Sequence, residues 1–206
     1  MRKLFLSSSF KDVSNLFKEF AQEDVKGKTV TFIPTASIPE KMKFYVGSAK
    51  KAFEKLGIIV DELEISESTK DEITNKLKQN DYIYVSGGNT FFLLQELKKK
   101  RADEVLIKQI ESGKLYIGES AGSMIVSPNI EYVKNMDDCR VAAELETFSA
   151  LNVIDFYPLP HYTNFPFKKA VEKIIAKYET ELNLYPISNY QAILITGENV
   201  IVETKD

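Results

Sequence analysis

A serine between two glycines is the residue of this chain best suited to covalent chemistry. Residues 118–122 read Gly-Glu-Ser-Ala-Gly, with Ser120 at the centre. The apolar run 115–117 before them predicts a short buried strand, and residues 121–126 after them predict the start of a helix. A serine at such a strand-to-helix turn presents its hydroxyl at the end of the sheet, where it can attack a carbonyl carbon. The segment therefore predicts a nucleophile elbow at Ser120.

Activation of a serine hydroxyl requires a base, and the chain contains one histidine, His161. It follows an apolar stretch that ends in Leu159 and Pro160, so we expect it on a loop at the end of a strand. A neutral imidazole near pH 7 is a suitable general base. A hydrogen-bonded loop histidine is the alternative interpretation, and the presence of Ser120 favours the catalytic one.

A second glycine-bearing turn, Gly87-Gly88, follows the apolar run 82–85. Ligands of an open parallel sheet bind beyond the carboxyl ends of its strands, so this turn should lie beside the serine turn. The expected oxyanion hole consists of the backbone N–H groups of Gly88 and Ala121, the residue after the serine. A phosphate cradle before a helix starting near Thr90 is the alternative. It is less favoured because neither G-x-G-x-x-G nor G-x-x-x-x-G-K-[ST] occurs.

Strand-like and helix-like segments alternate through the first 126 residues, and the last third adds a helix and a hairpin. This alternation predicts an α/β fold in which helices cover both faces of a mostly parallel sheet. The length of 206 residues is compatible with one domain over residues 1–206. The predicted strands are 4–7, 29–33, 58–63, 82–85, 115–117, 192–196 and 200–203, and the predicted helices are 13–20, 40–56, 73–77, 91–97, 105–111, 121–126 and 167–178.

Composition excludes several classes of protein. The hydrophobic fraction of 44% and the charged fraction of 28% are typical of a globular protein with a full core. The net charge of -3 gives no electrostatic reason to expect nucleic acid, and we expect the basic run 98–101 to be a solvated helix end. No run approaches the length of a membrane span, and the apolar N-terminal segment is too short for a signal peptide. A cytoplasmic location is therefore expected.

The single cysteine, Cys139, excludes an intrachain disulfide and a cysteine-based metal site. We expect no metal and no cofactor.

Three motifs together carry a resemblance to a known family. They are Gly-Gly-Asn-Thr-Phe at 87–91, Tyr-Ile-Gly-Glu-Ser-Ala-Gly at 116–122 and Pro-His-Tyr-Thr-Asn at 160–164. In this order they resemble the peptidase E family of serine peptidases, which contains the aspartyl dipeptidases and is related to cyanophycinase. The resemblance implies a three-layer sandwich of the class I glutamine amidotransferase-like kind. It also implies that Ser120 is the nucleophile and His161 the general base.

A catalytic triad needs a third residue that orients the imidazole. Asp137 and Asp138 lie between the serine and the histidine, in the region where the family carries an acidic residue, and we predict Asp138. Glu19, on the first predicted helix, is a rival. A carbonyl oxygen bound in the predicted oxyanion hole would leave the substrate's N-terminal residue near Asn89 and Glu119, which we predict to bind substrate.

The expected activity is hydrolysis of short peptides by an exopeptidase acting on di- or tripeptides, in a monomer or a homodimer. An esterase-type acyl hydrolase and a non-catalytic protein that binds a small metabolite are the alternatives. The aspartyl dipeptidases carry a longer segment with basic residues after the histidine motif, whereas Phe-Pro-Phe at 165–167 and a helix follow directly here. The sequence therefore does not predict a preference for an N-terminal aspartate.

Overall fold

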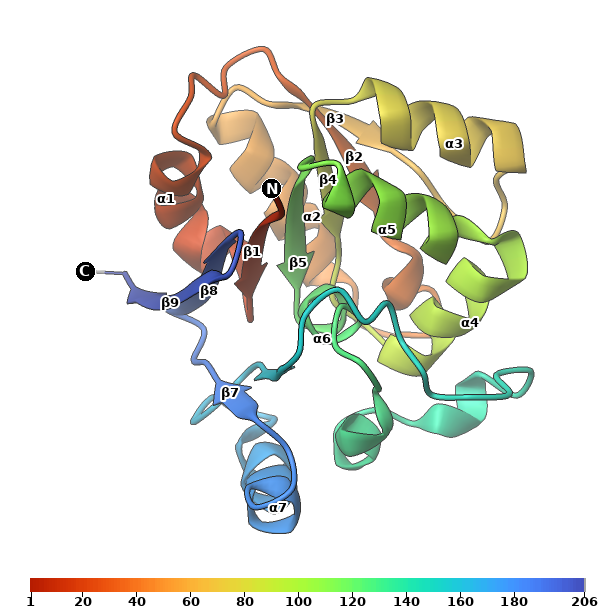
Figure 1. The fold of residues 1–206 in the computed structure, drawn as a ribbon, viewed down its shortest axis with the longest axis vertical. Coiled ribbons are helices and arrows are strands. Elements are labelled where there is room, and N and C mark those ends of the chain that lie inside the picture. Colours follow the sequence, from red (N-terminus) through yellow and green to blue (C-terminus); the bar gives the residue numbers. More distant parts are fainter. Residues whose placement is uncertain (206) are drawn as a thin grey trace.

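A seven-stranded sheet is the centre of the structure, a computed structural model that describes residues 1–205 (Figure 1). Its order is β3-β2-β4-β5-β1-β8-β9. The first five strands in this order are parallel, and β8 and β9 extend the sheet as an antiparallel hairpin beside β1. The predicted α/β fold with a mostly parallel sheet is confirmed. The strands are β1 Lys3–Ser7, β2 Thr29–Ile33, β3 Ile59–Glu62, β4 Tyr82–Val85, β5 Leu115–Glu119, β8 Gln191–Thr196 and β9 Asn199–Thr204.

Helices cover both faces of the sheet (Figure 1). On one face lie α1 (Phe10–Ala21) and α2 (Phe44–Lys55); on the other lie α3 (Lys70–Gln79), α4 (Thr90–Lys100) and α5 (Ala102–Glu111). Alternate residues of a strand point to opposite faces. Tyr84 in β4 accordingly packs with α1 and α2, and its neighbour Val85 packs with α3, α4 and α5. Both faces of β4 are buried, as its fully apolar and aromatic sequence predicts.

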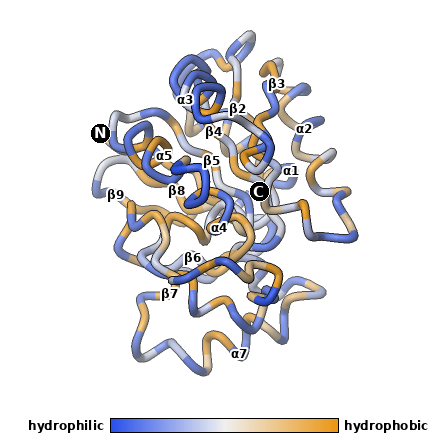
Figure 2. Tube along the Cα trace, turned by 90° about the vertical axis from the view of Figure 1, so that its right-hand side faces the viewer, coloured by the Kyte–Doolittle hydropathy of each residue, from blue (hydrophilic) through white to orange (hydrophobic). Residues whose placement is uncertain are grey.

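Aromatic rings fill the core between the sheet and the first two helices. Phe10 stacks on Phe53 with ring centroids 4.2 Å apart, and Phe32 stacks on Tyr84 at 4.5 Å. These rings anchor α1 and α2 to the strands that lead to the site. On the opposite face, α3 is largely hydrophilic (blue in Figure 2), and it buries only Ile73 and Leu77.

The start of α2 differs from the prediction. A helix was expected from residue 40, but α2 begins at Phe44. Residues 40–43 bury little, and the Met42 side chain is 71% exposed. Helices in proteins are stabilised mainly by packing of an apolar face, which this segment lacks.

The segment between β5 and β8 departs from the regular alternation. It holds α6 (Ala121–Met124), α7 (Lys168–Tyr178) and a two-stranded parallel sheet of β6 (Tyr157–Leu159) and β7 (Leu184–Pro186). Helix α7 and strand β7 lie at the bottom of Figure 1, beyond the C-terminal ends of the parallel strands. Short 3-10 helices lie at Thr35–Ser37, Glu131–Asn135 and Cys139–Val141. The pair β6 and β7 was not predicted.

Within residues 1–205 the longest helices, α1 and α2, have 12 residues each. A membrane span takes about 20, so none of the described helices could cross a bilayer.

Candidate active site

Ser120 occupies a strained turn between β5 and α6. Its backbone has φ 49° and ψ -106°, a conformation that residues with a side chain rarely adopt. The Ser120 N–H donates to the Ser7 carbonyl at 2.9 Å. A Cβ atom at Gly122 would lie 2.1 Å from the Val85 carbonyl oxygen, and one at Gly118 would lie 2.5 Å from the Gly122 carbonyl oxygen. Glycine is therefore required on both sides of the turn, as in a nucleophile elbow.

The imidazole of His161 lies against the serine hydroxyl. Its Nε2 atom is 2.9 Å from Ser120 Oγ. His161 comes two residues after the end of β6, with a backbone φ of 65°. The Phe167 ring stacks on the imidazole with centroids 4.7 Å apart and an interplanar angle of 24°. The two residues that the sequence singled out for nucleophile and base are thus brought within hydrogen-bond distance.

The other imidazole nitrogen contacts an amide. His161 Nδ1 lies 3.0 Å from Asn189 Oδ1. Because an amide oxygen only accepts hydrogen bonds, this contact places the ring proton on Nδ1. The lone pair of Nε2 then faces the Ser120 hydroxyl, which is the tautomer that a general base requires.

Hydrogen bonds join the loop after β6, which carries His161, to the loop after β7, which carries Asn189. The Asn189 N–H donates to Asn164 Oδ1 at 2.9 Å, and the Asn164 N–H donates to the His161 carbonyl at 2.9 Å. Asn164 is the last residue of the histidine motif, and Asn189 follows β7. The pairing of β6 with β7 therefore brings Asn189 to a histidine that is 28 residues away in sequence.

The predicted acidic partner of His161 needs correction, because none of the three candidates contacts the imidazole. The Asp138 carboxylate is paired with Arg140 at 2.8 Å, and this hydrogen bond lowers the pKa of Asp138 to about 2. Asp137 Oδ2 accepts hydrogen bonds from Thr90, at 2.8 Å from the N–H and 2.6 Å from the hydroxyl. Glu19 is exposed on α1. Asp138 is thus held in an ion pair, Asp137 at the N-terminus of α4, and Glu19 lies in solvent.

The two glycines after β4 lie beside the nucleophile. A Cβ atom at Gly87 would be 3.3 Å from Ser120 Cβ. Gly88 has φ +134°, and a Cβ atom there would be 2.1 Å from the Ala36 carbonyl oxygen, so only glycine fits. Ala121 is the first residue of α6, where a backbone N–H has no intrahelical partner. Within the described residues neither the Gly88 N–H nor the Ala121 N–H has a hydrogen-bond acceptor. Both are free to bind an oxyanion.

The two side chains predicted to bind substrate are engaged within the protein. Asn89 is 3% exposed; its Oδ1 accepts from the Phe92 N–H at 3.0 Å and its Nδ2 donates to the Asp138 carbonyl at 3.0 Å. Asn89 thereby caps α4. Glu119 is 4% exposed and accepts a hydrogen bond from the Tyr84 hydroxyl, inside the core that faces α1 and α2. Burial raises the pKa of Glu119 to about 7. The prediction that Glu119 binds substrate is therefore wrong, because its carboxylate lies in this core.

The electrostatics of His161 suit a neutral base. Burial lowers the pKa of the imidazole from its ordinary value of 6.5, and the hydrogen bond with Asn189 offsets part of this effect. Near pH 7 the ring is therefore mostly neutral and able to accept a proton.

Comparison with known proteins places the chain in a family. The model of peptidase family S51 matches residues 4–203. The chain belongs to peptidase family S51. The resemblance to peptidase E that the sequence motifs suggested is thereby confirmed.

Relatives of this S51 member match between 79% and 98% of its length in the two examples that follow. An uncharacterized peptidase of Listeria monocytogenes is 55% identical over 203 residues, which are 98% of this chain and 98% of that protein. Peptidase E of a Nostoc species is 28% identical over 79% of this chain and 66% of its own length. The crystal structure of a Listeria monocytogenes protein described as a candidate peptidase E superposes with a TM-score of 0.96 at 54% identity, covering 100% of both chains.

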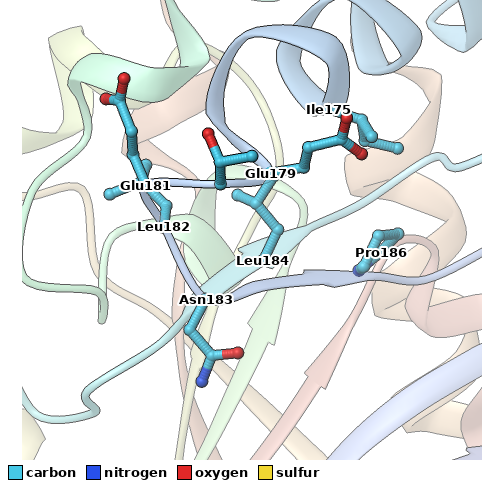
Figure 3. Close-up of a pocket in the computed structure, with 8 residues that line it drawn as sticks. Ile175, Glu179, Glu181, Leu182, Asn183, Leu184 and Pro186 are labelled. Atoms are coloured by element: carbon cyan, nitrogen blue, oxygen red, sulfur yellow. The ribbon is translucent and has the colours of Figure 1, made fainter.

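A surface hollow of about 540 Å³ lies apart from these residues, between the C-terminal end of α7 and β7 (Figure 3). Its wall includes Glu179 and Glu181, whose carboxylates point away from each other, and Asn183, which points in a third direction. These polar groups do not converge on a common point. Within residues 1–205 no three His, Cys, Asp or Glu side chains are grouped so as to hold a metal ion.

Proposed function

We propose that this S51 family member is a serine peptidase that hydrolyses short peptides through an acyl-enzyme on Ser120. The observation that carries the proposal is the 2.9 Å contact of Ser120 Oγ with His161 Nε2 at a strained elbow. In the first step Oγ attacks the scissile carbonyl carbon while Nε2 accepts the hydroxyl proton. The imidazolium then protonates the leaving amine, and water, deprotonated by His161, hydrolyses the ester.

The oxyanion of each tetrahedral intermediate would be bound by the backbone N–H groups of Gly88 and Ala121. Two observations support this assignment: the Gly87-Gly88 turn lies beside Ser120, and neither N–H has an acceptor within the described residues. Donors held rigidly in place stabilise developing charge without reorganisation, which typically contributes about 3 kcal/mol for each donor.

Asn189 takes the place that a carboxylate occupies in a Ser-His-Asp triad. We propose that it fixes the ring orientation and the Nδ1–H tautomer of His161. Burial lowers the pKa of His161, and the neutral Asn189 amide offsets this effect less than a carboxylate would.

The relatives and the fold bear on the substrate class and on the fold classification. Relatives named peptidase E support a peptidase. The exopeptidase that acts on di- or tripeptides with a free N-terminus is proposed from the sequence motifs, and the buried Glu119 does not supply the partner for the amino group. The strand order, with the elbow at the end of β5, supports the class I glutamine amidotransferase-like classification. A single domain, a cytoplasmic location and a monomer or homodimer stay predictions from the sequence.

A peptide panel tests the substrate class. Asp-Leu and Ala-Leu should be cleaved, and their N-acetylated forms should be cleaved much more slowly, because the proposed enzyme requires a free amino group. Amine release would be followed by chromatography, with a short-chain ester as the comparison. Equal cleavage of free and blocked peptides would reject the exopeptidase, and hydrolysis of the ester alone would favour the esterase.

The pH dependence of peptide hydrolysis should report His161. Because the pKa of His161 is lowered, the neutral base persists below pH 6.5, and kcat/KM should fall only as pH drops below this value. Asn189→Asp places a carboxylate at Nδ1, which favours the charged ring, so the fall should move to higher pH. Profiles of kcat/KM against pH for the native protein and for Asn189→Asp measure this shift. If kcat/KM falls at the same pH in both, the ionisation is not that of His161.

A further inference from the structure

Ser8, the residue directly after β1, is a buried serine that hydrogen-bonds to the loop that carries His161. Ser8 is 1% exposed. Its hydroxyl oxygen accepts a hydrogen bond from the His161 N–H at 3.0 Å, and its hydroxyl proton is donated to the Ile187 carbonyl at 3.0 Å. One side chain therefore contacts the backbone of both loops that form the proposed base, at His161 and just before Asn189.

The residue before Ser8 is fixed to the nucleophile. The Ser7 carbonyl accepts hydrogen bonds from the Ser120 N–H at 2.9 Å and from the Ser123 hydroxyl at 2.8 Å. Ser123 Oγ also accepts from the Ser7 N–H at 3.0 Å. The anchor of the nucleophile and the anchor of the base are thus adjacent residues of one chain segment.

The backbone of His161 needs such an anchor. Its φ of 65° is a left-handed conformation that costs free energy for a residue with a side chain. Backbone hydrogen bonds also hold this corner against the segment after β7: the Tyr162 N–H donates to the Ile187 carbonyl at 3.0 Å, and the Ile187 N–H donates to the Leu159 carbonyl at 3.0 Å. The His161 N–H itself is held by the Ser8 hydroxyl. Without the Ser8 hydroxyl, the partly buried His161 N–H would lose its acceptor.

We propose that Ser8 is a positioning residue that sets the distance between Ser120 Oγ and His161 Nε2. The inference rests on the proposed function of these two side chains. Ser8 touches no reacting atom and acts through the backbone of His161 and Ile187. Because a displacement of about 1 Å costs up to about 100-fold in rate, loss of this bridge should lower the reactivity of Ser120 and leave substrate binding largely intact.

The test compares Ser8→Ala with its neighbour Ser9→Ala. Ser9 is 9% exposed, and its side chain makes no capping hydrogen bond to α1, so it is a matched serine without the bridge. Ser8→Ala should lower kcat and the rate of Ser120 labelling by a fluorophosphonate by roughly 10- to 100-fold, with KM changed less than about twofold. Ser9→Ala should stay within about twofold of the native rates. Equal rates for the two variants would overturn the proposal.

A double variant separates positioning from general damage. If Ser8 acts through the imidazole, Ser8→Ala should have almost no effect on labelling once His161→Ala is present. The same fold-loss in both backgrounds would overturn the proposal while leaving the function intact. If the native protein is not labelled at Ser120, the proposed function fails as well. Ser8→Cys, which is close in size but a weak hydrogen-bonding partner, serves if Ser8→Ala does not fold, and it should show the same loss.

Discussion

Ser120→Ala should abolish peptide hydrolysis while the protein remains folded. Loss of the nucleophile from a serine triad lowers kcat by on the order of a million-fold. The one hydrogen bond of the Ser120 hydroxyl among the described residues is with the imidazole, and the backbone bond to Ser7 that holds the turn is kept in the variant. Peptide hydrolysis and thermal melting of the purified variant measure the two effects. Residual activity above a few per cent of the native rate would show that another residue carries the reaction.

His161→Ala should be nearly as damaging. Without the base the serine keeps its proton and its ordinary low reactivity, so kcat should fall on the order of 10⁵- to 10⁶-fold. Adding Ser120→Ala should cost little more, because the two side chains act as one unit. Hydrolysis rates of both single variants and of the double variant provide the comparison.

A matched control for His161→Ala is Tyr162→Ala in the same loop. Tyr162 is 40% exposed, and its backbone N–H bond to Ile187 is kept in the variant. This change should leave kcat within a few-fold of the native value. A large loss in Tyr162→Ala as well would mean that disruption of the loop, rather than loss of the base, explains the effect of His161→Ala.

The sheet and the nucleophile turn could be predicted because their sequence signals are local. Strands that are buried on both faces appear in the sequence as short apolar runs, as at 82–85. The apolar run at 115–117 begins the strand that leads into Ser120. Glycine is dictated by backbone contact at 118 and 122, where a Cβ atom would lie within 3 Å of a carbonyl oxygen. The sole histidine left one candidate for the base.

Asn189 could not be predicted because a non-local contact places it. It follows β7, a three-residue strand that ends in Pro186 and is too short for a periodic pattern. A carboxylate is the usual third residue of a serine triad, and Asp138 has this residue type and lies between the serine and the histidine in sequence. Its charge, however, is satisfied by Arg140 two residues later.

The orientation of Glu119 could have been predicted from strand geometry. Side chains alternate along β5, and Leu115 and Ile117 pack toward α1 and α2. Glu119 is two residues beyond Ile117 and therefore faces the same core, where Tyr84 provides its hydrogen bond. Ser120 lies just beyond the end of β5, and the proposed substrate would lie there and not on the face that Glu119 occupies.

Identification of the residue modified by a fluorophosphonate is the most direct test of the central claim, that His161 activates Ser120 for acyl transfer. Mass spectrometry of the digested protein should find the adduct on the peptide that contains Ser120, and the labelling rate should fall at acidic pH as His161 becomes protonated. The labelling rate should be strongly reduced, but still measurable at long incubation, in His161→Ala. No adduct at Ser120, or labelling at the native rate in His161→Ala, would contradict the account.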